Sequence, residues 1–328
     1  MTLDHDPAAG RSCPLHYRYL PEVFATPPTL DPVDVLYVAG GLYGNELALE
    51  RLLACFAAER GRTRLVFNGD FHWFDADPDV FSRVQRGVLA HTALRGNVET
   101  ELAAEAEAHA DADPGCGCAY PDWVDDQVVA RSNRILRRLR AASTPAQRAE
   151  LAALPMWLRL DVGPLRLGIV HGDAQSLAGW GFAQEHLRDP VHRDRLRAWF
   201  RQARVDAFAS SHTCLPVFQR LRGAPQACAA QPHWIFNNGA AGMPNFTGDP
   251  AGLLTRVALT PFVGARRRFG VRIGEVFVDA IAIDVDPRQA QARFLRQWPP
   301  GSDAYASYFQ RIVQGPRYRA DDAIRREE

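Results

Sequence analysis

The stretch RLVFNGDFHWFD at residues 64–75 joins an apolar run to a carboxylate. The run at 65–67 predicts a short buried strand, and Asp70 follows on the loop where that strand ends. In open α/β sheets the loops at the carboxyl ends of the strands line the ligand crevice, so a carboxylate there is well placed to hold a cation. Because a lone Gly-Asp more often caps a turn or a helix, the prediction of a site at Asp70 depends on how the other strands end.

Other predicted strands also end in side chains that bind metals. The run at 91–95 is followed by Asn97, the run at 165–170 by His171, and the run at 205–209 by His212. A carboxylate oxygen, an amide oxygen and two imidazole nitrogens make a suitable set of ligands for Mn²⁺, Fe²⁺ or Zn²⁺. A single histidine at a strand end is more often a hydrogen-bonded core residue. Four such strand ends in one sheet topology nevertheless predict a metal site.

The composition is that of a globular protein with no strong electrostatic preference. The 328 residues can bury a sizeable core, and 47% of them are hydrophobic. The 38 basic residues balance the 38 acidic ones, which argues against binding of nucleic acid or of an anionic membrane through net charge. All the basic residues are arginines, so lysine Schiff-base chemistry and the phosphate-loop lysine are excluded.

The cysteines and the apolar segments give no sign of export or of membrane insertion. Six cysteines are sparse for this length and show no disulfide-framework spacing. No signal-peptide pattern opens the chain, and no apolar run approaches the roughly 20 residues that a membrane span needs. We therefore expect a cytoplasmic protein.

The chain is predicted to form one large domain with an arm and a tail. Residues 1–30 are proline-rich and aperiodic and predict a surface arm, residues 31–300 predict the domain, and the polar residues 301–328 predict a peripheral tail. Within the domain, residues 100–155 predict a helical insertion. The residue patterns predict helices over 46–59, 78–89, 122–142 and 191–204, a further helix from 145, and strands over 33–39, 157–162, 165–170, 217–221, 233–236 and 275–285.

Two further motifs leave alternatives open. The pattern A-x-G-x-x-G at residues 39–44 is one substitution from the dinucleotide-binding fingerprint, with Asp70 as the acidic residue that would bind a ribose. The interval to Asp70 is longer than the expected ~20 residues, and the fingerprint explains neither histidine. Cys116 and Cys118, with His109 nearby, are a second candidate for metal binding, but their spacing is not that of a zinc site and favours a plain turn.

Taken in order, the strand-end motifs resemble those of a known family, the calcineurin-like metallophosphoesterases. The matching segments are Asn-Gly-Asp70, Gly-Asn97-Val-Glu99, Val-His171-Gly-Asp and Ser-His212-Thr-Cys214, followed by the turn from Asn237 to Gly242, which is similar to a turn in bacterial members. The resemblance covers about residues 33–285. It implies an α/β (α+β) fold, a two-sheet αββα sandwich flanked by helices, with a dinuclear metal site that catalyses phosphoester hydrolysis.

The chain departs from the family pattern at three ligand positions. Gly41 and Tyr43 stand where the family has an Asp-x-His motif, and Cys214 stands where it has the last histidine of Gly-His-x-His. In the family these three ligands serve one metal of the pair, and the four ligands predicted above serve the other, with Asp70 in the bridging position. Val98 replaces the histidine that many members use to protonate the leaving group. The resemblance therefore implies one intact metal site, with two ions only if other residues rebuild the second.

Four more residues are candidates for roles near the predicted metal. Arg95 is a candidate source of phosphate-binding charge, although an exposed arginine beside a strand is commoner. Tyr43 either places its phenol over the substrate or fills the space of the second metal. Cys214 is a candidate thiolate ligand, and His72 is a candidate for the vacated space.

Two functions fit these expectations. In the first, a phosphoesterase hydrolyses a small phosphomonoester or phosphodiester with a metal-bound hydroxide, and Asp70 and His171 lie at the catalytic centre. In the second, the chain is a catalytically silent relative that binds a ligand or a partner through the same crevice. The replacements at Gly41 and Tyr43 favour the second. The complete set of four ligands favours the first, because an unused site need not keep all of them, and we expect an enzyme for a small phosphorylated substrate.

Overall fold

Two six-stranded sheets make up the centre of the molecule. The structure, a computed structural model, describes residues 9–11, 13–104, 115–222 and 232–326. The first sheet contains β1 (Val35–Ala39), β2 (Thr63–Asn68), β3 (Thr92–Leu94), β9 (Gly252–Ala258), β10 (Arg267–Ile273) and β11 (Val276–Ile283). The second contains β4 (Trp157–Val162), β5 (Leu165–Val170), β6 (Ala207–Ser210), β7 (Val217–Leu221), β8 (His233–Asn237) and β12 (Ile324–Arg326). Within the described residues the spatial orders are β10-β11-β9-β1-β2-β3 and β12-β7-β8-β6-β5-β4.

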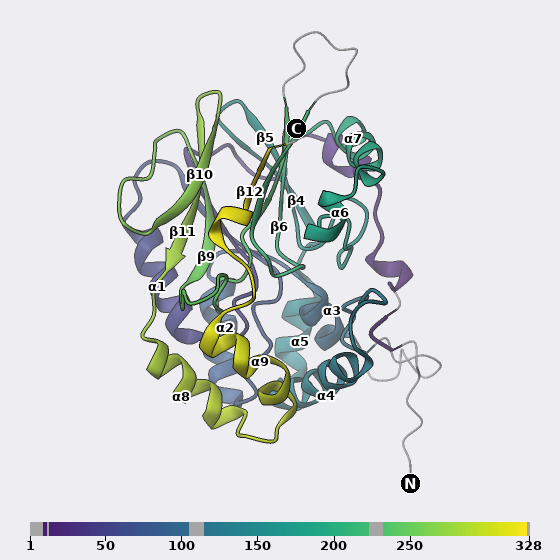
Figure 1. Cartoon of the computed structure of the whole chain (residues 1–328), viewed down its shortest axis with the longest axis vertical. Coiled ribbons are helices and arrows are strands. Elements are labelled where there is room, and N and C mark those ends of the chain that lie inside the picture. Colours follow the sequence, from purple (N-terminus) through teal and green to yellow (C-terminus); the bar gives the residue numbers. More distant parts are fainter. Residues whose placement is uncertain (1–8, 12, 105–114, 223–231, 327–328) are drawn as a thin grey trace.

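Helices cover the outer faces of both sheets and gather at one end of them (Figure 1). On the side of the first sheet lie α1 (Glu46–Ala57), α2 (Pro78–Leu89) and α8 (Pro287–Gln297). The second sheet is covered by α6 (Gln184–Arg188) and α7 (His192–Ala203). The other helices are α3 (Asn97–Ala103), α4 (Asp126–Ala142), α5 (Pro145–Ala152), α9 (Asp303–Gln314) and the short 3-10 helices η1 (Leu15–Tyr17), η2 (Pro21–Ala25) and η3 (Ala320–Asp322). None of the helices in the described ranges is long and apolar enough to cross a membrane.

Alternation along the strands builds the layers of this sandwich. On β1, Leu36 and Val38 point toward the second sheet, whereas Tyr37 points toward the helices and contacts Phe56 of α1 with ring centroids 5.5 Å apart. On β6, Phe208 faces the other helical layer. Each fully buried side chain of this size contributes roughly 1.5–3 kcal/mol through the hydrophobic effect. The structure therefore confirms the predicted two-sheet αββα sandwich.

Parallel strands bring the predicted functional residues to one edge of the sandwich. Strands β1, β2 and β3 run parallel in the first sheet, and β5, β6 and β8 run parallel in the second. The carboxyl ends of parallel strands meet at the same edge of a sheet, where loops are free to form a crevice. The loops that carry the predicted ligands follow β2, β3, β5 and β6 and therefore lie together.

The glycine-rich loop after β1 is closed by the turn at residues 237–242. The backbone N–H of Ala241 donates to the carbonyl oxygen of Gly40 at 2.9 Å, and that of Gly242 donates to the carbonyl oxygen of Gly41 at 3.0 Å. The loop is buried against protein on this side. Together with the two-sheet architecture, this closed loop does not fit the dinucleotide-binding alternative.

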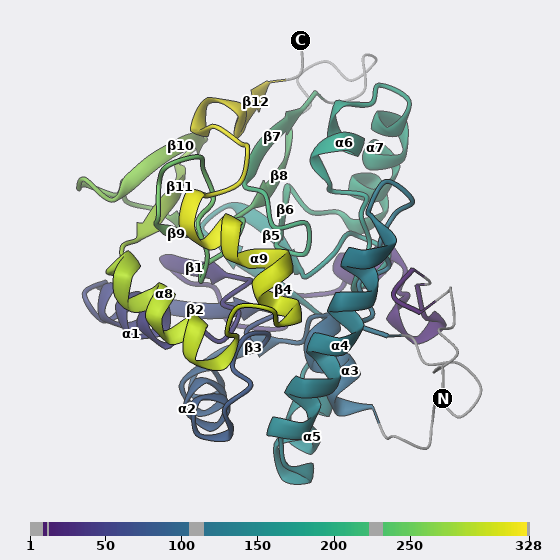
Figure 2. The ribbon, with the colours of Figure 1, turned by 60° about the horizontal axis from the view of Figure 1, so that its bottom comes forward.

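Residues beyond 300, where the polarity predicts a peripheral tail, include a helix and a strand that contact the rest of the chain. Helix α9 packs against α4 and α8 (Figure 2), and an ion pair of 2.6 Å joins Asp303 to Arg134 of α4. Strand β12 then pairs with β7 at the edge of the second sheet. The expected surface arm also reaches inward, because Tyr17 and Phe24 are fully buried. The division of the chain into an arm (1–30), a domain (31–300) and a tail (301–328) stays a prediction.

A partly buried ion pair joins β9, a strand that was not predicted, to the segment that follows α1. Arg256 Nε donates to Glu59 Oε1 at 2.6 Å, and the hydroxyl of Tyr37 donates to the same oxygen at 2.9 Å. Burial alone would raise the pKa of Glu59, but the hydrogen bonds from Arg256 and Tyr37 outweigh burial and hold the pKa below its ordinary value. The stability from this pair is therefore present above the pKa of an unfolded glutamate, about 4.3, and is lost as the pH falls through the lower pKa of folded Glu59.

The variant Glu59→Gln tests this ion pair. Because the change leaves the buried Arg256 charge uncompensated, we expect the free energy of unfolding at pH 7 to fall by about 3 kcal/mol in urea titrations. The difference between wild type and variant should shrink below about pH 4, where the wild-type carboxylate also loses its charge. The exposed Glu50→Gln on α1 is the control, with an expected change within about 0.5 kcal/mol. Equal stability of the two variants would contradict the assignment.

Candidate metal centre

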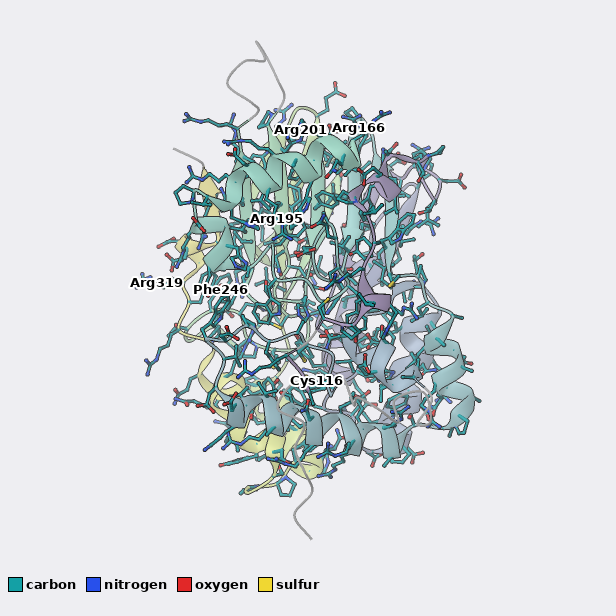
Figure 3. All side chains as sticks on the ribbon, turned by 90° about the vertical axis from the view of Figure 1, so that its right-hand side faces the viewer. Cys116, Arg166, Arg195, Arg201, Phe246 and Arg319 are labelled. Atoms are coloured by element: carbon teal, nitrogen blue, oxygen red, sulfur yellow. The ribbon has the colours of Figure 1, made fainter. Side chains whose placement is uncertain are left out.

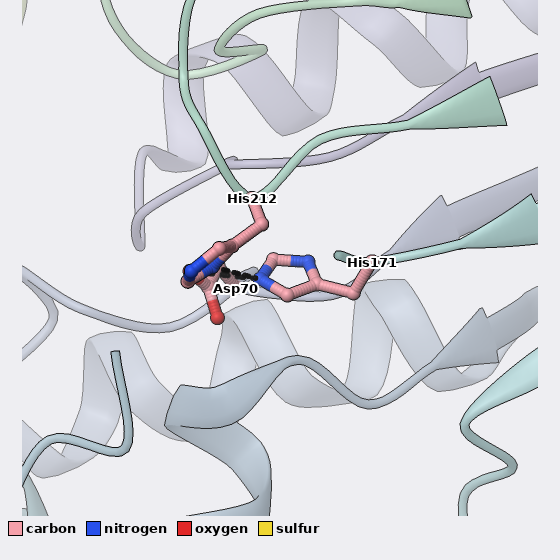
Figure 4. A group of neighbouring side chains, drawn as sticks. All are labelled: Asp70, His171 and His212. Atoms are coloured by element: carbon pink, nitrogen blue, oxygen red, sulfur yellow. Dashed lines mark hydrogen bonds and ion pairs between the residues drawn. The ribbon is translucent and has the colours of Figure 1, made fainter. Parts of the chain in front are cut away.

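The four predicted ligand residues converge at the carboxyl ends of four strands. Asp70 follows β2, Asn97 begins α3 after β3, His171 follows β5 and His212 follows β6. His171 Nε2 lies 3.3 Å from Asp70 Oδ2, 3.2 Å from Asn97 Oδ1 and 3.2 Å from His212 Nδ1. Figure 4 shows Asp70, His171 and His212 pointing toward one another from three segments. All four side chains are buried. For Asp70, His171 and His212, one ligand atom of each lies within 4.8 Å of the ligand atoms of the other two.

Backbone carbonyl groups determine which nitrogen of each histidine carries a proton. His171 Nδ1 lies 2.9 Å from the carbonyl oxygen of Asn68, and His212 Nε2 lies 3.1 Å from that of Cys118. A carbonyl oxygen only accepts, so these ring nitrogens donate. The lone pairs of the neutral rings are therefore on His171 Nε2 and His212 Nδ1, the two atoms that face each other.

Hydrogen bonds to the backbone also orient Asp70 and Asn97, whose side-chain oxygens are predicted to bind the metal. Asn97 Nδ2 donates to the carbonyl oxygen of Cys116 at 2.9 Å, which leaves Oδ1 directed at His171. Asp70 Oδ1 accepts from the backbone N–H of Val98 at 3.2 Å, which leaves Oδ2 for the cluster. Two nitrogens and two oxygens are thus directed at one point by bonds behind them. Metal-binding histidines are oriented by their other ring nitrogen in the same way.

The electrostatics of the cluster fit a cation. Burial, together with the charge on His171, lowers the pKa of His212 to about 3, so that ring is neutral at pH 7. Burial alone would raise the pKa of Asp70, but His171 and His212 outweigh burial and lower it. Burial alone would lower the pKa of His171, but Asp70 outweighs burial and raises it. At most one proton is shared among four inward-facing donors, and this nitrogen and oxygen set suits a divalent transition metal.

Glu99 holds the loop that carries Asp70. Its Oε2 accepts from the backbone N–H groups of Asp70 and Gly96, both at 2.8 Å, and its Oε1 accepts from that of His72 at 3.2 Å. Asp70 has φ of 52°, a left-handed conformation that costs a non-glycine residue roughly 1–2 kcal/mol. Burial raises the pKa of Glu99, and the charge of Asp70 adds to this effect. A Cβ at Gly96 would lie 2.3 Å from Asp70 Oδ1, so only glycine permits this approach.

Tyr43 and Cys214 bind each other beside the four donors. The Tyr43 hydroxyl lies 2.6 Å from Cys214 Sγ. Burial raises the pKa of both groups, which favours a phenol and a thiol over their anions. Among the described residues, Cys214 lies outside the group whose ligand atoms approach within 4.8 Å. This geometry favours the interpretation in which Tyr43 fills space, and it gives a Cys214 thiolate ligand no support.

The other two candidates lie away from the donors. His72 Nδ1 bonds to Asp75 Oδ2 at 2.5 Å, and its ring stacks on Phe81 with centroids 3.7 Å apart. Arg95 donates from its side chain to the carbonyl oxygen of Ala152 at 3.4 Å, and burial lowers its pKa. Neither residue lines the cavity beside the four donors. The position of Arg95 therefore gives a phosphate-binding role no support.

A cavity of about 240 Å³ lies beside the donors and is lined by Asp70, Asn97 and His212. The sequence prediction missed most of its other walls, which include Arg311 of α9 and four aromatic residues, Trp73, Tyr120, Trp180 and Tyr308. The ring of Trp180 packs against that of His212 at 5.3 Å. The cavity thus combines the donors with one guanidinium group and apolar ring faces.

The Cys116 to Cys118 segment supports the predicted ligand residues, and among the residues that the structure describes its cysteines belong to no metal-binding group. Its carbonyl groups accept from Asn97, His212 and Trp180. Figure 3 labels Cys116, which is fully buried inside the molecule next to α4. The segment is a turn, as its spacing favoured. His109 lies outside the described residues.

Comparison with known proteins identifies the fold. No family model matches the sequence, and no curated protein matches it. Among solved structures, a metallophosphoesterase from Sphaerobacter thermophilus is 15% identical over 86% of this chain and 100% of that chain, with a TM-score of 0.52. The hypothetical protein PH1004 from Pyrococcus horikoshii OT3 is 12% identical over 87% of this chain and 99% of that chain, with a TM-score of 0.57. The chain therefore has a metallophosphoesterase fold, which confirms the fold that the resemblance implied.

The variant Glu99→Gln tests the support of the Asp70 loop. In the wild type both carboxylate oxygens accept hydrogen bonds from backbone N–H groups. In the variant one oxygen is replaced by an NH₂ group, which cannot accept, so at least one buried N–H loses its partner. We expect the free energy of unfolding to fall by at least about 2 kcal/mol in urea titrations. Mn²⁺ affinity, measured by calorimetry, should fall roughly 10- to 100-fold because Asp70 is no longer held in place. Glu50→Gln is again the control, and wild-type manganese affinity in the Glu99 variant would refute this role.

Proposed function

We propose that this chain is a metal-dependent phosphoesterase that hydrolyses a small phosphomonoester or phosphodiester. The observation that carries the proposal is the convergence of four buried donor atoms whose lone pairs are directed at one point. The adjoining cavity offers space for a substrate against these donors. The fold shared with a metallophosphoesterase supports this reaction class by analogy.

Asp70, Asn97, His171 and His212 would hold one divalent transition metal, Mn²⁺, Fe²⁺ or Zn²⁺. When bound, such an ion lowers the pKa of a coordinated water and neutralises charge on a phosphoryl oxygen. The chain itself keeps the donors aimed through the backbone carbonyl groups behind them. The ring of Trp180 shields His212 from water on one side, which strengthens electrostatic interactions at the donors.

A single ion is the occupancy that the neighbouring side chains support. The hydrogen bond between Tyr43 and Cys214 joins two of the three positions where the family places ligands for a second metal. Without an ion, burial favours the phenol and the thiol over their anions. One ion would supply less positive charge for hydrolysis than the two ions of a two-metal site.

The alternative is a catalytically silent relative that binds a phosphorylated ligand in the same cavity. The filling of the second ligand position by Tyr43 and Cys214 favours it. The two functions share metal binding and differ in turnover. They are therefore separated by measuring hydrolysis in protein whose metal content is known.

Elemental analysis of protein equilibrated with Mn²⁺ and then desalted should give one manganese ion per chain. His212→Ala removes one nitrogen donor, so we expect its manganese content to fall below about a tenth of an ion per chain under the same conditions. His16→Ala, which changes an exposed histidine, should keep the full content. Two ions per chain would disprove the single-ion assignment, and manganese retained by the His212 variant would disprove the ligand set.

A hydrolysis screen of the manganese-loaded protein should find turnover of p-nitrophenyl phosphate, of bis(p-nitrophenyl) phosphate or of a nucleotide. In His171→Ala the rate should fall at least about 100-fold, because the central donor is lost. Circular dichroism establishes that the variant is folded, and His16→Ala should keep the wild-type rate. Full metal loading without turnover of any substrate would favour the silent relative. Undiminished turnover in the His171 variant would place the active site elsewhere.

A further inference from the structure

We infer that Arg311 binds the phosphoryl oxygens of the substrate and that the aromatic walls of the same cavity receive a planar ring on that substrate. The inference rests on the proposed function and names its substrate class. That class is a phosphoester of a ring-bearing alcohol, such as a phenol or a nucleoside. Two observations carry it, the state of the Arg311 guanidinium and the composition of the cavity wall.

Arg311 supplies the only cationic side chain among the described residues that line the cavity. One terminal nitrogen donates to the carbonyl oxygen of Cys214 at 2.8 Å, which fixes the guanidinium in place. Its Nε–H is buried without a hydrogen-bond partner, and in the described part of the chain its other terminal nitrogen forms no hydrogen bond and no ion pair with a carboxylate. A guanidinium has five N–H donors in a planar fork that matches phosphate oxygens. Arg311 is therefore held in position with donors left for an anion.

The negative charge of a bound phosphoester in this cavity would require a cationic residue such as Arg311. A phosphate monoester carries about two negative charges, and Asp70 adds another at the base of the cavity. One divalent ion leaves part of this charge uncompensated, and Arg311 is the cationic side chain that lines the cavity in the described part of the chain. The chain has no lysine, so an arginine has to supply the remaining positive charge. Charge-assisted hydrogen bonds from arginine to phosphate are among the strong ones.

Aromatic rings form much of the remaining wall. Trp73 and Tyr308 lie with ring centroids 6.5 Å apart, and Tyr120 and Trp180 lie 6.2 Å apart. All four line the cavity that contains Arg311 and Asp70. Aromatic side chains in a cavity wall gain from a planar apolar group, through ring contacts and burial. An alcohol without a ring would make fewer of these contacts.

Calorimetry on the manganese-loaded protein tests the role of Arg311 with inorganic phosphate as the probe. Arg311→Gln should weaken phosphate binding at least about tenfold, the effect of one lost charge-assisted hydrogen bond. Arg311→Lys should weaken it less, because lysine keeps the charge but lacks the planar fork. Arg296→Gln, an exposed arginine of the neighbouring α8, should bind phosphate as the wild type does. Manganese content is measured on the same samples and should stay unchanged in all three variants.

Phenyl phosphate and methyl phosphate test the aromatic wall in the wild type. Phenyl phosphate should bind at least about tenfold more tightly, which corresponds to roughly 1.4 kcal/mol. Equal affinities for the two esters would overturn the ring-binding part. Wild-type phosphate affinity in folded Arg311→Gln would overturn the assignment of Arg311. If that variant does not fold, Arg311→Lys, which keeps a donor for Cys214, decides in its place. Binding that depends on Arg311, without hydrolysis of phenyl phosphate or of any substrate in the screen, would overturn the proposed function and leave the binding role of Arg311 standing.

Discussion

Converging lone pairs are the constraint on which this site depends. His212 Nδ1 and the side-chain oxygens of Asp70 and Asn97 each lie 3.2–3.3 Å from His171 Nε2, with at most one proton among these atoms. Such an arrangement is unfavourable in a buried environment unless a proton or a cation compensates it. The chain enforces it with carbonyl groups that accept from the far side of both imidazoles and of the amide. The donors are therefore set before any ion arrives, which lowers the cost of binding one.

The sandwich itself sets the distances between these donors. Two of the four strands that carry them belong to the first sheet and two to the second. Asn68 Nδ2 donates to the carbonyl oxygen of Val170 across the sheets at 2.7 Å, one residue before His171. Close packing makes the spacing of the two sheets rigid. A change that shifts one sheet against the other would move Asp70 relative to His171, so stability of the core and geometry of the site are coupled.

The sequence predicted what is encoded locally and missed what depends on distant contacts. Helix 78–89 and strands 157–162, 165–170 and 217–221 have the predicted bounds, because periodicity and a leading proline mark them. Strand β9 was missed because it is buried on both faces and shows no alternation. The four residues of the cluster were proposed as ligands from strand ends, whereas the carbonyl of Cys118 that orients His212 leaves no signal in the sequence. Arg311 was missed because its polar segment suggested a tail, although Tyr305, Phe309 and Ile312 recur with helical spacing.

Because Arg311 lies on α9, it is synthesised later than the four side chains that are predicted to bind the metal. The last of the four donors, His212, precedes Arg311 by 99 residues. Since ribosomes add about 5–20 residues per second, the donors emerge roughly 5–20 s before the guanidinium during synthesis. Helix α9 docks against α4 only after residues 303–314 have been made. A nascent chain thus contains every donor for an ion before it contains the wall that would hold an anion against it.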